Sequence, residues 1–238
     1  MLAKLLHGLV MFTWSVFFFW LYFVDPNQLA KLLHPKLWWL VLTGGTILLL
    51  FSVITFKTAR THHHATPLRW SWPSVAIMLV PLAYCWSTQS AQLGSHTFLA
   101  RTTTTPNMSS PAFSATTNNS PQQPMADNQV ITSLSQVAFN SRQLNGQRTS
   151  LLCQTMKNEN LPEDLFICYR FRITCCAADA LPIFTFVQVT PQNTLPKNDD
   201  WVRVNGTITS QTVEGRTFPL IIATSLTSEQ APSFPYIY

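Results

Sequence analysis

Charged residues are scarce in this chain. They make up 11% of its 238 residues, while hydrophobic residues make up 47%. About a quarter of the residues in a soluble domain are normally charged, so the deficit indicates segments that lie in lipid. Lys and Arg outnumber Asp and Glu by 15 to 10, yet no basic run marks a nucleic-acid-binding surface. We therefore expect no nucleic-acid partner.

Catalytic signatures are also missing. The sequence contains no nucleophile–base–acid triad, no pair of catalytic carboxylates and no Gly-rich phosphate loop. Its 5 Cys follow neither the spacing of a paired-Cys zinc frame nor that of a disulfide-dense secreted scaffold. We expect a protein that is not an enzyme.

Apolar stretches dominate residues 1–92, which we predict to be a transmembrane domain of three helices. The predicted spans are residues 5–24, 37–56 and 73–90. About 20 apolar residues cross the hydrocarbon core, which fits the first two; the third has a shorter apolar core and contains Pro81. A cleaved signal peptide does not fit the first stretch, because it is long and further spans follow it. Gly44 and Gly45 favour close helix contact in the second span.

The distribution of basic residues predicts the orientation in the cell membrane. One face carries Lys4, Lys57, Arg60 and Arg69, and the other carries Lys31, Lys36 and Arg101. This bias favours a cytoplasmic N-terminus and an extracytoplasmic C-terminal half, whereas two spans would place that half in the cytoplasm. The predicted spans contain no Asp, Glu, Lys or Arg. Because transport pathways usually contain ionisable residues, we expect an anchor or subunit rather than a complete transporter.

The remaining sequence divides into a linker and a β-rich domain. Residues 93–128 are rich in Thr, Ser, Pro and Asn, which predicts a disordered tether. Residues 129–238 form the predicted β domain, with residues 130–140 as a helix or edge element. Alternating patterns predict strands over residues 148–156, 165–175, 183–189, 201–209 and 218–226. Five short strands favour a small closed barrel of the oligonucleotide/oligosaccharide-binding (OB) type, with a small sandwich as the alternative.

Two adjacent cysteines form the least ordinary motif. If the strand continues to Cys176, then Cys175 points to the core and Cys176 lies on the face of Arg170 and Arg172. A nearby cation favours the thiolate, the form that binds zinc or another thiophilic metal. Asp179 would supply an oxygen ligand.

The candidate metal ligands are therefore Cys175, Cys176 and Asp179, with Cys168, Arg170 and Arg172 as further candidate site residues. The alternative is that these cysteines are small buried hydrophobes, because adjacent cysteines do not make the usual spaced metal knuckle.

The sequence around these cysteines resembles that of the YcgQ-like permease subunits of Gram-positive bacteria. The resemblance is carried by Cys-Cys-Ala-Ala-Asp-Ala at residues 175–180 and by Arg-Ile-Thr before it, and it continues in five other segments. These are residues 34–35, residues 79–82 with Gly94, residues 145–147, residues 201–208 and residues 232–238. The chain departs from the family pattern at residues 151–154 and 183–184, so ligand contacts there do not carry over.

The resemblance implies a membrane protein that works beside a larger multi-span permease. It leads to the hypothesis of an accessory permease subunit, with helices that dock on the partner in the lipid bilayer and a β domain that binds the partner, a small solute or a metal ion. The alternatives are a thiol-dependent metal-binding or redox membrane protein and a structural envelope protein. The transported substrate is not implied.

Overall fold

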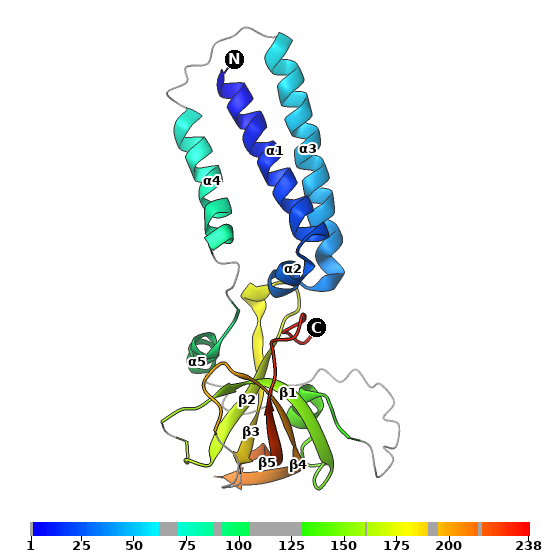
Figure 1. Ribbon diagram of the computed structural model, residues 1–238, viewed down its shortest axis with the longest axis vertical. Coiled ribbons are helices and arrows are strands. Elements are labelled where there is room, and N and C mark those ends of the chain that lie inside the picture. The colour runs from blue at the N-terminus through cyan, green and yellow to red at the C-terminus, as the bar shows by residue number, and fades with distance from the viewer. Residues whose placement is uncertain are drawn as a thin grey trace. The chain divides into compact units, whose positions relative to one another are not determined.

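The computed structural model describes residues 2–61, 71–87, 92–104, 130–159, 161–189, 195–213 and 216–238. The chain divides into two compact units, built mainly on residues 1–92 and on residues 93–173 with 178–237. Among the described residues, the first unit is helical and the second contains the five strands (Figure 1).

The helical unit is built around a pair of long apolar helices. Its elements are α1 (Leu2–Phe23), α2 (Pro26–Leu32), the 3-10 helix η1 (Pro35–Leu37), α3 (Trp38–Thr61) and α4 (Ser71–Ser87). By length and composition, Leu5–Phe23 and Pro35–Thr58 are candidate membrane spans. The apolar part of α4, Val75–Tyr84, is shorter, so the third predicted span stays a prediction.

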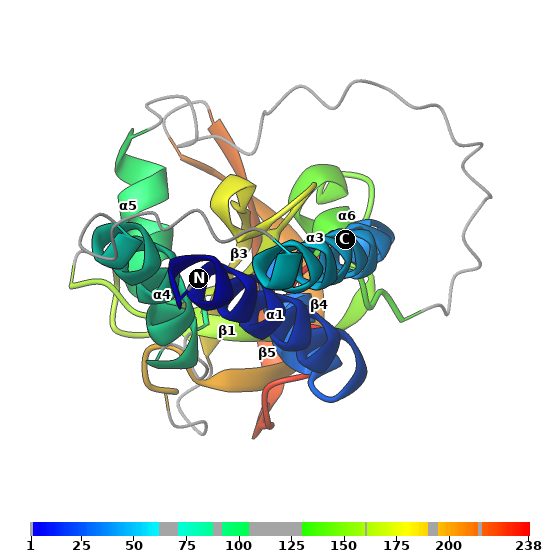
Figure 2. The same cartoon turned by 90° about the horizontal axis from the view of Figure 1, so that it is seen from above.

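Glycines let α1 and α3 approach closely, and the two helices lie side by side (Figure 2). The Ser15 hydroxyl donates to the Gly45 carbonyl at 2.8 Å, and the Ser52 hydroxyl donates to the Gly8 carbonyl at 2.9 Å. A Cβ added to Gly45 would lie 3.4 Å from the Cβ of Phe18. The predicted helix contact at Gly44 and Gly45 is therefore confirmed.

The second unit is a closed β-barrel. Its strands are β1 (Arg148–Met156), β2 (Leu165–Arg172), β3 (Leu181–Val189), β4 (Trp201–Val213) and β5 (Arg216–Ser228). They follow the order β1-β2-β3-β5-β4, which β1 and β4 close by pairing with each other. Only β3 and β5 run parallel among these pairs. A closed Greek-key barrel of five strands resembles the OB fold, as predicted, and is not a sandwich.

The interior of the barrel is apolar, and a short helix contributes to it. Helix α6 (Leu134–Asn140) begins at Ser133, whose hydroxyl caps it by accepting from the Gln136 backbone N–H at 3.4 Å. Leu134, Val137 and Ala138 are buried in the same cluster as the inward side chains of the strands. The expected helix or edge element over residues 130–140 is thus a helix, preceded by a single bridge from Ile131 to Thr149.

A second apolar layer lies on the other face of β2. Helix α5 (Ser95–Thr104) places Phe98, which is buried, against Tyr169 and Phe184, with ring centroids 4.9 and 5.5 Å away. The prediction of a disordered tether is therefore wrong for residues 95–104, because the buried side chain of Phe98 packs this polar segment against the barrel. Residues 105–128 of the predicted linker lie outside the described residues.

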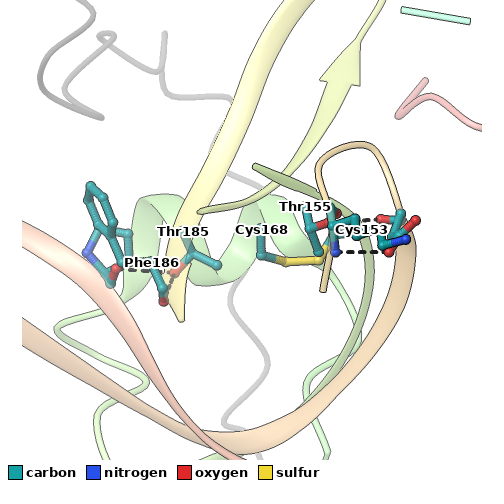
Figure 3. Close-up of a disulfide and its surroundings, with 8 residues drawn as sticks. Cys153, Thr155, Cys168, Thr185 and Phe186 are labelled. Atoms are coloured by element: carbon teal, nitrogen blue, oxygen red, sulfur yellow. Dashed lines mark hydrogen bonds between the residues drawn. A yellow bond between two sulfur atoms is a disulfide. The ribbon is translucent and has the colours of Figure 1, made fainter. Parts of the chain in front are cut away.

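A disulfide joins β1 and β2 inside the barrel. Cys153 and Cys168 have a Cα–Cα distance of 5.5 Å, and both residues are fully buried. Figure 3 shows this bridge between the side chains of Thr155 and Thr185. Thr155 donates to the Lys197 carbonyl at 2.5 Å and Thr185 donates to the Pro219 carbonyl at 3.1 Å, so both buried hydroxyls have backbone partners.

Candidate metal centre

The two adjacent cysteines lie on a turn that follows β2. The strand ends at Arg172, and after Ile173 the chain bends and forms the 3-10 helix η3 (Ala177–Asp179). Because the alternation stops at Arg172, the prediction that Cys175 points to the core is wrong. Cys175 is exposed and Cys176 is half-buried. Core packing therefore does not account for the pair.

The turn brings three potential ligand atoms together. The two Sγ atoms are 3.6 Å apart. One ligand atom from each of Cys175, Cys176 and Asp179 lies within 4.8 Å of the others. In a tetrahedral zinc site with Zn–S bonds of about 2.3 Å, two sulfur ligands lie about 3.8 Å apart. The sulfur separation therefore fits shared coordination of one ion without rearrangement of the backbone.

Cys168 does not belong to this group. Its sulfur is bonded to that of Cys153, so it offers no thiolate, and the sequence-based proposal of Cys168 as a further site residue is wrong. Its partner could not be chosen from the sequence, because only the register of β1 and β2 brings these two cysteines together.

Arg170 binds the C-terminal segment. Its guanidinium donates to the backbone carbonyls of Phe234, Pro235 and Tyr236 at 2.8, 3.1 and 3.2 Å, and its Cζ lies 5.6 Å from the ring centroid of Trp201. These contacts give Arg170 a structural role that the strand pattern did not reveal. Arg172 is exposed at the end of β2, where it forms a backbone bridge to Ile237.

Both ends of the cysteine turn are anchored in the outer apolar layer. Ile173 before the turn and Ala180 after it are buried in the same cluster as Phe98 of α5. Arg101, one helical turn further along α5, donates to the backbone carbonyls of Ala178 and Ala180, at 3.1 Å for Ala178. The carbonyls on either side of Asp179 are thus held by one guanidinium.

Asp199 holds the N-terminus of α5. Its carboxylate accepts from the Ser95 backbone N–H at 2.5 Å, from the Ser95 hydroxyl at 2.8 Å and from the Tyr169 hydroxyl at 2.7 Å. Burial raises the pKa of Tyr169 well above its ordinary value, and the hydrogen bond to Asp199 and the negative charge of Asp199 add to the increase. Sequence reasoning missed this group, because Ser95 and Asp199 are 104 residues apart.

Comparisons with known proteins give little beyond the family. No curated protein matches the chain in sequence. A DUF3299 family protein from Pseudomonas aeruginosa PAO1 is 15% identical with a TM-score of 0.27, and the match covers 37% of this chain and 64% of that protein. The chain therefore spans just under two thirds of the length of that protein. Yeast RPA bound to ssDNA is 12% identical with a TM-score of 0.30, covering 44% of this chain and 79% of that one. Neither likeness bears on function.

The family match covers the part of the chain that contains the barrel and the cysteine turn. Residues 101–238, more than half of the sequence, match the family model of the DUF1980 C-terminal domain. The chain therefore belongs to the DUF1980 C-terminal domain family.

Proposed function

We propose that the chain is a membrane-anchored accessory subunit of a permease, and that its barrel presents a thiophilic metal ion to that partner. The observation that carries this proposal is the group of Cys175, Cys176 and Asp179, whose ligand atoms lie within 4.8 Å of one another. Two thiolates select soft or borderline ions such as Zn²⁺ or Cu(I), and a carboxylate favours Zn²⁺ of the two. Zinc is therefore the first ion to test.

Three protein ligands suit an ion that is passed on. Structural zinc sites are closed by four protein ligands, whereas sites with three keep one position for water or an incoming group. The exposure of Cys175 leaves the group within reach of a second protein. An open position and an exposed thiol together favour ligand exchange with a partner over permanent storage.

The disulfide supports the location outside the cytoplasm. Disulfides form and persist in oxidising compartments and are rare in the cytosol. The buried Cys153–Cys168 bridge therefore supports the extracytoplasmic barrel that the distribution of basic residues predicts. In an oxidising compartment the thiolates of Cys175 and Cys176 are open to oxidation, and coordination to a metal ion would protect them.

The helices support the need for a partner. Residues 5–24 and 37–56 contain no Asp, Glu, Lys or Arg, so these helices offer no charged pathway of their own. Large apolar side chains on α1 and α3 are exposed, among them Phe12, Val16, Leu50 and Ile54. These surfaces suit lipid or the helices of a multi-span permease, and the resemblance to YcgQ-like subunits favours the permease.

Metal analysis of the purified full chain tests the metal site. We expect about one equivalent of zinc in the wild type, loss of zinc in Cys175→Ser/Cys176→Ser, and affinity reduced about tenfold or more in Asp179→Asn, since three ligands share the ion. Glu163→Gln is the matched control, because Glu163 is an exposed carboxylate on the turn before β2. Equal zinc content in the wild type and the double variant would refute the site.

Isolation from the native membrane tests the partner. A tagged full chain, solubilised in mild detergent, should carry a multi-span membrane protein with it in fixed ratio. A chain that is always isolated alone would remove the permease from the proposal without affecting the metal site.

One further candidate function is supported by the distance of 3.6 Å between the Sγ atoms of Cys175 and Cys176. The pair would act as a redox dithiol: the two thiols lose two electrons and two protons, form a disulfide with each other, and reduce one disulfide of a thiol–disulfide exchange partner to two thiols. Mass spectrometry of the alkylated chain distinguishes the two functions. At a metal site, both cysteines stay reduced and become open to alkylation once a chelator removes the ion. A redox pair is found as a disulfide between the two cysteines.

A further inference from the structure

Helix α5 reaches the cysteine turn directly, and this contact suggests how metal binding is controlled. We propose that α5 is a strap that sets the geometry of the Cys175–Cys176–Asp179 turn, with Arg101 as the positioning residue. This inference rests on the proposed metal site and adds its regulation.

The strap is held at its N-terminus and in its middle. At its N-terminus, Ser95 donates twice to Asp199, and the negative charge of that carboxylate suits the positive end of a helix. Gly94 lets the loop approach, since a Cβ there would lie 3.0 Å from an Asp199 carboxylate oxygen. In its middle, Phe98 is 3% exposed and packs against Tyr169. The helix therefore has one defined seat on the outer face of β2 and β3.

From that seat, Arg101 acts on the metal turn. Its two terminal nitrogens donate to the carbonyls of Ala178 and Ala180, the residues on either side of Asp179. A planar guanidinium holds two acceptors in a fixed relation, which an ammonium does not. The backbone at Asp179 is therefore fixed by α5, while the two cysteines lie earlier in the turn. Loss of Arg101 should disturb the oxygen ligand more than the sulfur ligands.

The contacts at the N-terminus of α5 suggest how the strap is released. Two hydrogen bonds from Ser95 to Asp199 hold this end. A partner that binds Asp199 or draws Ser95 away from it would free the N-terminal end of the strap. Release of α5 would remove Arg101 from the turn and lower the affinity for the ion, which is what delivery to a permease requires.

Co(II) bound to the purified full chain tests the strap, because its spectrum separates the two kinds of ligand. The intensity of the sulfur-to-cobalt charge-transfer band reports thiolates, and the ligand-field bands report the whole coordination sphere. For Arg101→Gln we expect an unchanged charge-transfer band, altered ligand-field bands and affinity about tenfold weaker, the usual scale for loss of a group that orients a ligand. Arg101→Lys should restore part of the affinity, and Arg148→Gln, an exposed arginine at the start of β1, should match the wild type.

Each outcome distinguishes this inference from the proposed function. If the wild type binds Co(II) and Arg101→Gln has the same spectrum and affinity, the strap is refuted and the metal site stands. If the wild type binds no Co(II), the proposed function fails and the inference falls with it. Hydrogen exchange guards against simple unfolding. Exchange in the Arg101→Gln variant should be faster at residues 177–180 and unchanged in β1, and faster exchange throughout the barrel would also count against a specific positioning role.

Discussion

At the residue scale, four of the five cysteines, Cys153, Cys168, Cys175 and Cys176, divide into two chemical environments that the sequence does not separate. Cys153 and Cys168 are fully buried and bonded, while Cys175 is exposed and Cys176 half-buried. The motif at residues 175–180 could be recognised from sequence because its members are neighbours in the chain. The disulfide could not, because it depends on which strands pair and in which register.

Removal of the disulfide should destabilise the barrel. The bridge spans 15 residues of sequence, and the chain-entropy model assigns a loop of that size about 3 kcal/mol. We expect Cys153→Ala/Cys168→Ala to lower the free energy of unfolding by about that amount. Urea unfolding of the full chain in detergent measures the loss, with amide exchange in β1 and β2 as the readout. The double variant Cys175→Ser/Cys176→Ser should unfold like the wild type without metal, and an equal loss there would contradict the division of roles.

Tyr169 should make the stability of the barrel depend on alkaline pH. Its pKa is raised in the folded state by burial and by Asp199, so the fold favours the neutral phenol. The contribution is fully present below the ordinary tyrosine pKa of about 10 and is lost as pH rises above it. In Tyr169→Phe we expect a loss of about 2 kcal/mol at neutral pH and a flatter decline above pH 10, measured by urea unfolding at several pH values. Parallel curves for the two proteins would show that Tyr169 does not titrate with unfolding.

At the element scale, the strands were predictable where side chains alternate between a buried and a half-exposed face. Strand β1 has the predicted bounds, whereas β4 and β5 each extend beyond the prediction, to Val213 and from Arg216 to Ser228. The added residues are mostly Ser, Thr and Gln, which give no period-two hydrophobic signal but pair through their backbones. Helix α5 was missed for a related reason, because its Thr-rich sequence has one deeply buried side chain, Phe98, among those described.

Gly206 should be essential for the pairing of β4 with β5. The register shifts between Asn205 and Gly206, and an added Cβ would lie 2.3 Å from the Ile222 carbonyl oxygen. Because that atom belongs to the backbone of the neighbouring strand, the strain cannot be relieved by a change of rotamer. Gly206→Ala should cost about 3 kcal/mol or more and raise the protease sensitivity of the barrel. Thr224→Ala, an exposed change on β5, should have no such effect, and a fully resistant Gly206→Ala protein would show that the strands can move apart.

At the scale of the whole molecule, composition and periodicity separated the chain into a helical part and a barrel because the two parts differ in hydrophobic period. Apolar runs of about 20 residues and alternating strands are both local signals. The hydrogen bonds between α5 and Asp199 are long-range, and so are those between Arg170 and the C-terminal segment. These contacts join distant parts of the sequence through polar side chains, for which hydrophobic patterns give no information.

The membrane topology can be tested on the whole chain with two matched cysteine variants. In a background with Cys85, Cys175 and Cys176 changed to Ser, Thr224→Cys places a thiol on the exposed face of β5 and Lys57→Cys places one near the end of α3. The basic residues near Lys57 favour the cytoplasm for that end, and the Cys153–Cys168 bridge favours an oxidising compartment for the barrel.

A membrane-impermeant maleimide should therefore label Thr224→Cys in intact cells and Lys57→Cys only after the cells are permeabilised. This result requires an odd number of spans between the two positions and so makes α4 a true membrane helix. Labelling of both positions only after permeabilisation would leave two spans before the barrel, put the cysteine turn in a reducing compartment, and require a cytoplasmic source for any ion that it binds.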